Sequence, residues 1–351
     1  MFRILEYFLF FYLGAISTLF FPKGAVIRAF FFWNLFIIIL QKMNWVGGLS
    51  SLDGYSSNVS ERVQGIASFP SEMGLILNLL FCYFVYEPKN SPQYQNRFFS
   101  SRFIATIPSS FGRYFLRTSY LYWMFLLFGV LIVFTGNRIS MLALLITFLW
   151  RLKQSIQWHS LPSYLPLFFV FPVICLCLGY AIFSSIGVYE RSADLFSWKN
   201  LDLFSLVWDK IDIATELKSD IGLASKEYDL SWWIRLHKWL FVTKSFYLHP
   251  ATYLQGLGPG FAGPALDGGL LRIFIEYGFV GIYFFWKFFG SLYRINSQTK
   301  AMVIAFALNM IFFDAYLAYK TMSFFLFACG SIYAFQISTN FHRFPRLIPS
   351  L

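Results

Sequence analysis

Runs of apolar residues long enough to cross a lipid bilayer recur along this chain and constrain its fold more than any other feature. A transmembrane helix needs about 17 to 25 consecutive, mostly apolar residues. Stretches of this kind, one of them short, predict helices at residues 4–21, 25–41, 70–86, 119–136, 139–152, 164–186, 270–291, 301–318 and 322–338. The sequence therefore predicts an all-α, polytopic membrane helix bundle of about nine spans.

The composition agrees with a membrane protein. Only 13% of the residues are charged and 58% are hydrophobic, whereas soluble domains carry about 25% charged residues. The cysteines all fall inside apolar runs, where thiols pack as small hydrophobic groups, so no disulfide and no metal site is expected. The first span lacks a basic segment followed by a small-residue cleavage site, and we therefore expect a mature helix rather than a signal peptide.

The orientation of the bundle follows from the Lys and Arg residues of its short loops, because cytoplasmic loops retain positive charge. The segment 88–119 holds five of them, and placing it inside leaves few basic residues in the short outer regions, namely Arg3, Lys42, Arg62, Arg138 and Lys320. This arrangement predicts a cytoplasmic C-terminus and, with nine spans, an outer N-terminus. The net charge of +11 then indicates topology and contact with anionic lipids, with no nucleic-acid partner expected.

One large outer loop separates the N-terminal helices, residues 1–186, from the C-terminal helices and cytoplasmic tail, residues 270–351. This loop, residues 187–269, contains ten of the seventeen acidic residues. Within it, apolar residues recur at helical spacing in SWWIRLHKWLFVTKSFYLHP, which predicts a helix lying at the membrane interface. Arg235 lies on this helix, whose simplest role would be to anchor the loop.

A glycine-rich segment, GLGPGFAGPALDGG, closes the outer loop. Its glycines match the spacing G-x-G-x-x-G of dinucleotide-binding loops, but that motif requires a preceding strand and a helix that starts inside it. Pro259 and Pro264 interrupt such a helix, so the dinucleotide interpretation is rejected. We expect instead a loop in which the main chain at Gly258 and Gly260 can approach another group closely.

The order of these residues carries a resemblance to a known family. Arg235, Trp239, HPATYLQGLGPGF, Asp267 and LLRIFIEYGFVGIYFF follow one another as in the R…W…P…G-x-G-x-G-F…(D or H)…L…E-x-G-x-x-G pattern of the Wzy-type O-antigen polymerase and O-antigen ligase superfamily. Upstream, ERVQGIASFPSEMGLIL with Arg62 resembles the family's R-x-x-G-x-F-x-x-P segment, and FTGNRISMLAL with Arg138 is similar to its T-G-S-R-x-x-x-L segment. The matching region extends over residues 61–289, about two thirds of the chain.

The resemblance implies an inverting, metal-independent glycosyltransferase without a cofactor. Such an enzyme joins undecaprenyl diphosphate-linked repeat units of a surface polysaccharide on the periplasmic face of the bacterial inner membrane. Its partners would be the lipid-linked oligosaccharide, membrane lipids, and a chain-length regulator and a flippase of the same pathway. Family members usually have more helices and a cytoplasmic N-terminus, which differs from the nine spans expected here.

Outer arginines are the first candidates for binding diphosphate, because guanidinium groups stay charged and bind phosphate oxygens bidentately. They are Arg62, Arg138, Arg191, Arg235 and Arg272. Arg138 interrupts two spans with almost no loop around it, where a charge is costly unless it faces a cavity or a partner. Arg138 could alternatively anchor a helix end, and Arg191 could bind lipid headgroups.

Two acidic residues are candidates for the catalytic site. Asp267 would act as the base that activates the attacking sugar hydroxyl, or would cap the helix that follows it. Glu276 lies four residues after Arg272, so the two share a helical face and are expected to pair. We expect Asp267, Arg138, Arg235 and Glu276 to be catalytic, and Arg62, Arg191, Arg272, Gly258 and Gly260 to bind substrate.

Three other functions remain open. An O-antigen ligase would transfer finished glycan to lipid A-core, but Asp267 stands where ligase relatives carry His. A polysaccharide flippase or other transporter would show inverted repeats and ionisable residues at the membrane midplane, and among the predicted spans only Glu276 and Asp314 qualify. A structural scaffold would not explain the outer arginines.

Overall fold

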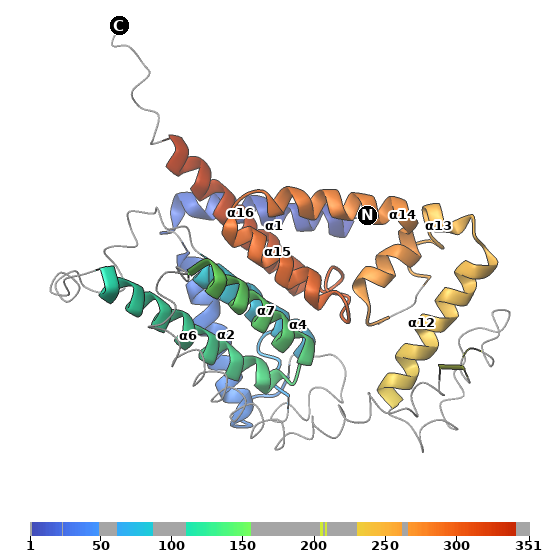
Figure 1. The fold of residues 1–351 in the computed structure, drawn as a ribbon, viewed down its shortest axis with the longest axis horizontal. Coiled ribbons are helices and arrows are strands. Elements are labelled where there is room, and N and C mark those ends of the chain that lie inside the picture. The colour runs from blue at the N-terminus through green and yellow to red at the C-terminus, as the bar shows by residue number, and fades with distance from the viewer. Residues whose placement is uncertain are drawn as a thin grey trace, which may run out of the picture. The chain divides into compact units, whose positions relative to one another are not determined.

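The structure, a computed structural model, describes residues 2–22, 24–48, 62–86, 110–155, 204–205, 208, 230–261 and 266–341. Within these ranges the regular secondary-structure elements are α-helices (Figure 1). The helices belong to two compact units. Unit 1 comprises Met1–Leu161, Gly290–Asn309 and Ala315–Leu351, and unit 2 comprises Pro162–Phe289 and Met310–Asp314.

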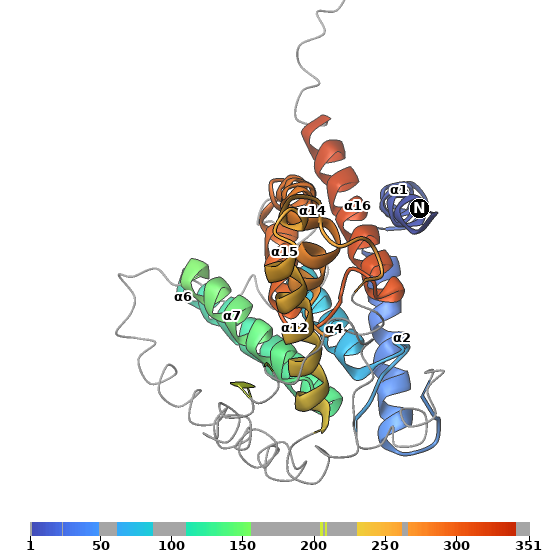
Figure 2. The ribbon, with the colours of Figure 1, turned by 90° about the vertical axis from the view of Figure 1, so that its right-hand side faces the viewer.

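Unit 1 is built around helix α4, which is buried along almost its whole length. The residues of α4 are mostly apolar around the whole helix, as expected for the central helix of a bundle. Helices α6, α7, α15 and α16 pack against it, and α1 packs along α16 (Figure 2). The helices of this unit are α1 (Phe2–Phe20), α2 (Ala25–Lys42), α4 (Pro70–Val85), α6 (Ser110–Thr135), α7 (Arg138–Ser155), α15 (Ser297–Asn309) and α16 (Tyr319–Phe341).

Glycines allow α1 and α16 to approach each other at backbone distance. A Cβ atom built on Gly14 would lie 2.0 Å from the carbonyl oxygen of Phe327, and one on Gly330 would lie 1.9 Å from that of Phe11. Small residues of this kind are common where membrane helices pack closely. They fix the N-terminal helix on the last one.

Three of the described helices are long and apolar enough to cross a membrane, which indicates a membrane protein. They are Ala25–Lys42, Gly269–Tyr293 and Tyr319–Ser338, and shorter apolar helices cover Leu5–Phe20, Pro70–Val85 and Tyr120–Thr135. Helices are therefore found where most of the predicted spans begin and end. The predicted span 164–186 and most of the outer loop 187–269 lie outside the described residues.

One predicted span differs from the helix that is observed. Residues 301–318 were expected to form a single helix, but α15 ends at Asn309 and residues 310–318 form turns. The Asn309 side chain donates a hydrogen bond to the Ala305 carbonyl and accepts one from the Ser140 hydroxyl. An apolar run does not itself specify where a helix stops, and here the run continues into an irregular segment that presents main-chain and carboxylate groups.

Unit 2 contains α12 (Leu230–Leu248), the short α13 (Thr252–Gln255) and the first part of α14 (Gly269–Tyr293). The helix predicted in the outer loop is confirmed as α12. One face of α12 packs onto α14 and the segment before it, through a cluster of Leu236, Leu240, Phe241, Val242, Phe246, Leu266 and Ile275. Its position at a membrane interface stays a prediction.

Candidate functional site

The glycine-rich loop of unit 2 packs against a break in helix α14. Gly278, inside this helix, has φ 61° and ψ −158°, which is not helical. The Leu257 N–H donates to the Ile275 carbonyl at 2.7 Å, and the Gly258 N–H donates to the Glu276 carbonyl at 3.2 Å. In a continuous helix those carbonyls would accept bonds from residues four positions later, so the loop replaces the partners that the break removes.

Glycine is required at several points of this contact. A Cβ on Gly256 would lie 2.4 Å from the Glu276 carbonyl oxygen, and one on Gly278 would lie 2.5 Å from that of Leu254. The closest main-chain approach is thus made at Gly256 and Gly278, between the loop and the backbone of α14. By contrast, a Cβ on Gly258 or Gly260 would meet no described atom within 4 Å.

The segment just before α14 is held by three hydrogen bonds to two side chains, those of Asp314 and Trp239. The carboxylate of Asp314 accepts the Leu266 N–H through Oδ2 and the Gly268 N–H through Oδ1, both at 3.1 Å. The indole Nε1 of Trp239 donates to the Leu266 carbonyl at 3.0 Å. Asp267, between the two bonded N–H groups, has φ 55°, a conformation that non-glycine residues adopt only rarely.

Arg235 and Asp267, which lie 32 residues apart in the sequence, form an ion pair. The Arg235 Nε donates to the Asp267 Oδ2 at 2.8 Å, and the two side chains remain 39% and 34% exposed. Gly268 directly precedes α14, and its carbonyl accepts the Arg272 N–H at 2.7 Å. Gly268 thus occupies the N-cap position of α14, where Asp267 was the expected alternative. The Asp267 carboxylate is instead bonded to Arg235.

Arg272 is buried between two carboxylates. Its Nε donates to Glu276 Oε1 at 2.9 Å and its Nη1 donates to Asp314 Oδ2 at 2.8 Å, and all three side chains are at most 10% exposed. The pairing that the spacing of Arg272 and Glu276 predicts is present. Asp314 was not among the predicted site residues, although an acid within an apolar run is costly and hence a functional signal by itself.

In unit 1, the two upstream motifs lie against each other. The Arg62 Nε donates to the Thr135 carbonyl at 3.3 Å, and the Val63 N–H donates to the Phe134 carbonyl at 3.0 Å. Gly136 follows with φ 64°, and Arg138, partly buried, begins α7. Two of the predicted site arginines therefore belong to one region of this unit.

The loop that carries Arg62 is fixed by a buried glutamine of α2. Gln41 Oε1 accepts the N–H groups of Gln64 and Gly65 at 3.0 and 2.8 Å, and its Nε2 donates to the Gly65 carbonyl at 3.0 Å. The Lys320 ammonium donates to the Ile66 carbonyl at 2.8 Å. Polar side chains of helices thus replace the secondary structure that this loop lacks.

Basic residues predicted to lie on the outer side also gather in this region. The Lys42 ammonium lies 5.2 Å from the centre of the Phe134 ring, next to the segment that Arg62 contacts. Lys42, Arg62, Arg138 and Lys320 belong to segments that are joined by the contacts just described. Arg191, the remaining predicted substrate-binding arginine, lies outside the described residues.

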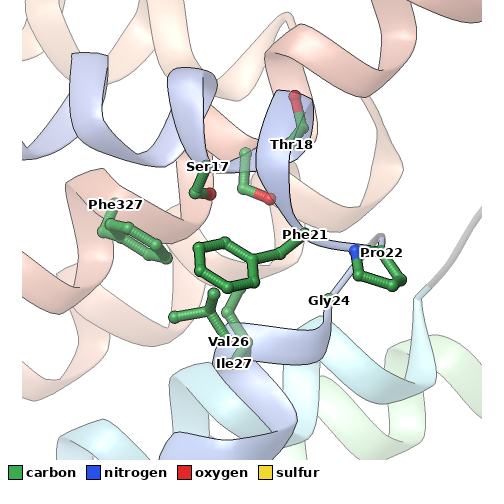
Figure 3. Close-up of a pocket in the computed structure, with 9 residues that line it drawn as sticks. Ser17, Thr18, Phe21, Pro22, Gly24, Val26, Ile27 and Phe327 are labelled. Atoms are coloured by element: carbon green, nitrogen blue, oxygen red, sulfur yellow. The ribbon is translucent and has the colours of Figure 1, made fainter.

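A small pocket in unit 1 lies where α1 turns into α2, with the Phe21 ring and Phe327 on its wall (Figure 3). The Ser17 and Thr18 hydroxyls there donate to carbonyls of their own helix. Among the described residues that line the pocket, none is acidic or basic. The charged side chains of unit 2, whose contacts are described above, are therefore the better candidate site.

The arrangement in unit 2 combines an accessible ion pair with a buried support. Arg235 and Asp267 are partly exposed, whereas Arg272, Glu276 and Asp314 are buried. In the part of the chain that the structure describes, no three His, Cys, Asp or Glu side chains gather as a metal site would require. The chain matches no protein-family model, no curated protein and no solved structure.

Proposed function

We propose that this chain is a polysaccharide polymerase of the Wzy type, a metal-independent glycosyltransferase in the bacterial inner membrane. It would join undecaprenyl diphosphate-linked repeat units on the periplasmic face, as its sequence resemblance suggests. The observation that carries the proposal is the accessible Arg235–Asp267 pair at the end of the glycine-rich loop. Both residues belong to the motif on which the resemblance depends.

The ion pair uses only one nitrogen of the Arg235 guanidinium and one oxygen of the Asp267 carboxylate. Among the described residues, Arg235 is bonded through Nε and Asp267 through Oδ2. The two terminal amino groups of Arg235 thus remain for phosphate oxygens, which guanidinium binds bidentately. Asp267 Oδ1 remains for the hydroxyl of an acceptor sugar. A phosphate-binding and a proton-accepting group thereby flank one small region of the molecule.

The proposed step is a single displacement at the anomeric carbon of the donor. The acceptor hydroxyl oxygen forms the new glycosidic bond while its proton passes to Asp267 Oδ1. The bond from the anomeric carbon to the phosphate oxygen breaks, and undecaprenyl diphosphate leaves with the electron pair. Guanidinium groups stabilise the charge that develops on the leaving diphosphate, which is the kind of preorganised electrostatic effect that dominates many enzymes.

Arg62 and Arg138 are assigned to diphosphate binding in this proposal. Their support is the shared region of unit 1, where the Arg62 motif contacts the turn that Arg138 follows. Basic side chains of Lys42 and Lys320 belong to the same region. A concentration of positive charge suits a headgroup that carries two phosphates. Arg191 keeps its proposed role in substrate binding from the sequence.

Glu276 and Arg272 are assigned a supporting role. Each is buried and hydrogen bonded to the other, so a diphosphate would have to displace a carboxylate to reach Arg272. We therefore propose that Arg272 and Glu276 support the structure around Asp267 and do not contact the substrate. The Gly258 N–H is bonded to the Glu276 carbonyl, but a Cβ on Gly258 or Gly260 would meet no described atom within 4 Å, so a glycan can approach the chain at both glycines.

The decisive experiment is a deletion strain complemented with variants. Without the protein, lipopolysaccharide should carry a single repeat unit on its core, and the wild-type gene should restore the polymer ladder. Asp267→Asn should remove the ladder, because loss of a general base costs about 10²- to 10⁴-fold in rate. Arg138→Lys should be badly impaired, because an ammonium group cannot reproduce the bidentate fork.

A matched control removes a charge from the same helix as Arg235. Lys244 donates to the Trp208 carbonyl and takes no part in the Asp267 pair, so Lys244→Gln should keep the ladder. If deletion instead removes antigen from the core while lipid-linked polymer accumulates, the protein is a ligase. If repeat units remain on the cytoplasmic face, it is a flippase, and the polymerase proposal fails.

The proposed orientation has its own test. Cysteine introduced at Ser219 should react with a membrane-impermeant maleimide in intact spheroplasts, and cysteine at Ser100 should react only after the membrane is opened. The prediction follows from the loop charges. The reverse labelling pattern would contradict both the topology and a periplasmic active site.

A further inference from the structure

We infer that Asp314 is a positioning residue for Asp267 and that it acts through the main chain. The catalytic consequence rests on the proposed function, whereas the positioning is a property of the structure alone. Asp314 lies in the irregular segment after α15, 47 residues from Asp267 in the sequence. No contact between their side chains is needed, because the carboxylate of Asp314 accepts the main-chain N–H groups of the residues before and after Asp267.

The two oxygens of one carboxylate fix two peptide planes at once. Oδ2 accepts the Leu266 N–H and Oδ1 accepts the Gly268 N–H. The Gly268 N–H belongs to the peptide group directly after Asp267. The peptide group directly before Asp267 contains the Leu266 carbonyl, which Trp239 binds, and the Leu266 N–H lies one peptide group earlier. The two bonds to Asp314 therefore span Leu266 and Asp267, and together with Trp239 they restrain the main-chain torsions of Asp267. This matters because Asp267 has φ 55°, which is unfavourable for a residue with a Cβ atom. Without the clamp, the segment would relax and turn the Asp267 side chain.

Asp314 is itself held in place. Arg272 Nη1 donates to its Oδ2, and the same guanidinium is bonded through Nε to Glu276. The Asp314 side chain is only 10% exposed, so its contacts with these donors are shielded from water. A continuous series of contacts therefore runs from Glu276 through Arg272 and Asp314 to the peptide groups around Asp267.

Trp239 of α12 also holds the segment before α14. Its indole donates to the Leu266 carbonyl at 3.0 Å, so both the N–H and the carbonyl of Leu266 are bonded. Arg235, one helical turn earlier on α12, then pairs with Asp267. The Asp267 carboxylate is thus directed toward Arg235 by a main chain that Asp314 and Trp239 hold.

Hydrogen–deuterium exchange tests the positioning without any assay of activity. In purified protein, Asp314→Asn should speed exchange in a peptide containing residues 266–268 by about tenfold or more, because one of two acceptors becomes a donor. Peptides from α1 and α16 should exchange as in the wild type. Unchanged exchange at residues 266–268 in a folded variant would overturn the inference.

Turnover of lipid-linked repeat units by the purified protein tests the consequence. Asp314→Asn should lower kcat about tenfold or more and leave KM nearly unchanged. In an Asp267→Ala background, the same substitution should cause almost no additional loss, because residues that act through one another are not additive. A full additional loss in the double variant would overturn the inference, as would a normal kcat in the single variant.

Two further variants keep the experiment decisive. Asp314→Glu retains the charge but moves the oxygens by one methylene, so it should also speed exchange and lower kcat, and it serves if Asp314→Asn does not fold. Glu6→Gln neutralises an exposed acid of α1 and should change neither quantity. If the wild type shows no polymerisation, the proposed function fails, and the exchange result alone decides whether Asp314 positions the segment.

Discussion

The break in α14 at Gly278 makes a sharp prediction, because a single methyl group should oppose it. Gly278→Ala would place a Cβ 2.5 Å from the Leu254 carbonyl oxygen and 2.6 Å from that of Tyr253. Its torsions, φ 61° and ψ −158°, are nearly restricted to glycine and cost another residue about 1–3 kcal/mol. Forcing an extra methyl into packed surroundings adds about 1–3 kcal/mol. The expected destabilisation is therefore about 2–6 kcal/mol.

The measurement is the apparent Tm of the detergent-solubilised protein, followed by the loss of the monodisperse peak in size-exclusion chromatography. A change of 1 kcal/mol shifts Tm by about 2–4 °C in proteins of 150–250 residues, so Gly278→Ala should melt several degrees lower. Gly290 lies on the same helix and would place its Cβ in open space. Gly290→Ala should therefore be neutral or stabilise by about 0.5–1 kcal/mol. Equal Tm values for Gly278→Ala and wild type would refute the observed break in the helix.

Three further substitutions test other parts of the structure by the same melting assay. Gly14→Leu should destabilise unit 1 by at least about 1–3 kcal/mol, since even a Cβ would lie 2.0 Å from the Phe327 carbonyl oxygen; a wild-type Tm would contradict the α1–α16 packing. Gln41→Leu should cost about 1–3 kcal/mol for each buried donor left unpaired, including the Gly65 N–H, and a neutral result would contradict the anchoring of that loop. Burial lowers the pKa of His237, so the unfolded chain takes up a proton more readily and stability should fall as the pH drops below the ordinary histidine value of about 6.5. His237→Gln should flatten that decline between pH 7.5 and 5, and an unaltered pH profile would exclude His237 as its cause.

Local patterns predicted most of the helices, because apolar runs and helical periodicity are properties of neighbouring residues. The ends of α2 and α4, and the existence of α12 inside a polar loop, follow from such patterns. The spacing of Arg272 and Glu276 also predicted their contact, since both residues lie on one helical face. These are features in which sequence distance and spatial distance agree.

Other features depend on contacts between distant residues and could not be predicted in that way. The end of α15 at Asn309 lies inside an apolar run, so composition gave no reason to stop the helix there. Asp314 contacts Arg272 and the segment around Asp267 only because residues 310–314 return to unit 2. Similarly, the glycine-rich loop was expected to approach a ligand, whereas residues 257 and 258 bond to the backbone of α14. Glycine spacing indicates a close approach but does not identify the group approached.

From the sequence, several arginines were equal candidates for binding phosphate. Their surroundings in the structure distinguish Arg272 from Arg235. Arg272 has both Nε and Nη1 bonded to buried carboxylates, whereas Arg235 is bonded through Nε and is 39% exposed. A buried charge network loses about 3–5 kcal/mol when one partner is removed, and a lysine cannot bond two carboxylates from separate nitrogen atoms. Arg272→Lys should therefore lower the Tm, while Arg235→Lys should leave the Tm nearly unchanged and lower turnover. If Arg235→Lys instead destabilises the protein as much as Arg272→Lys does, then Arg235 belongs to the structural support, and the phosphate-binding role must pass to another arginine.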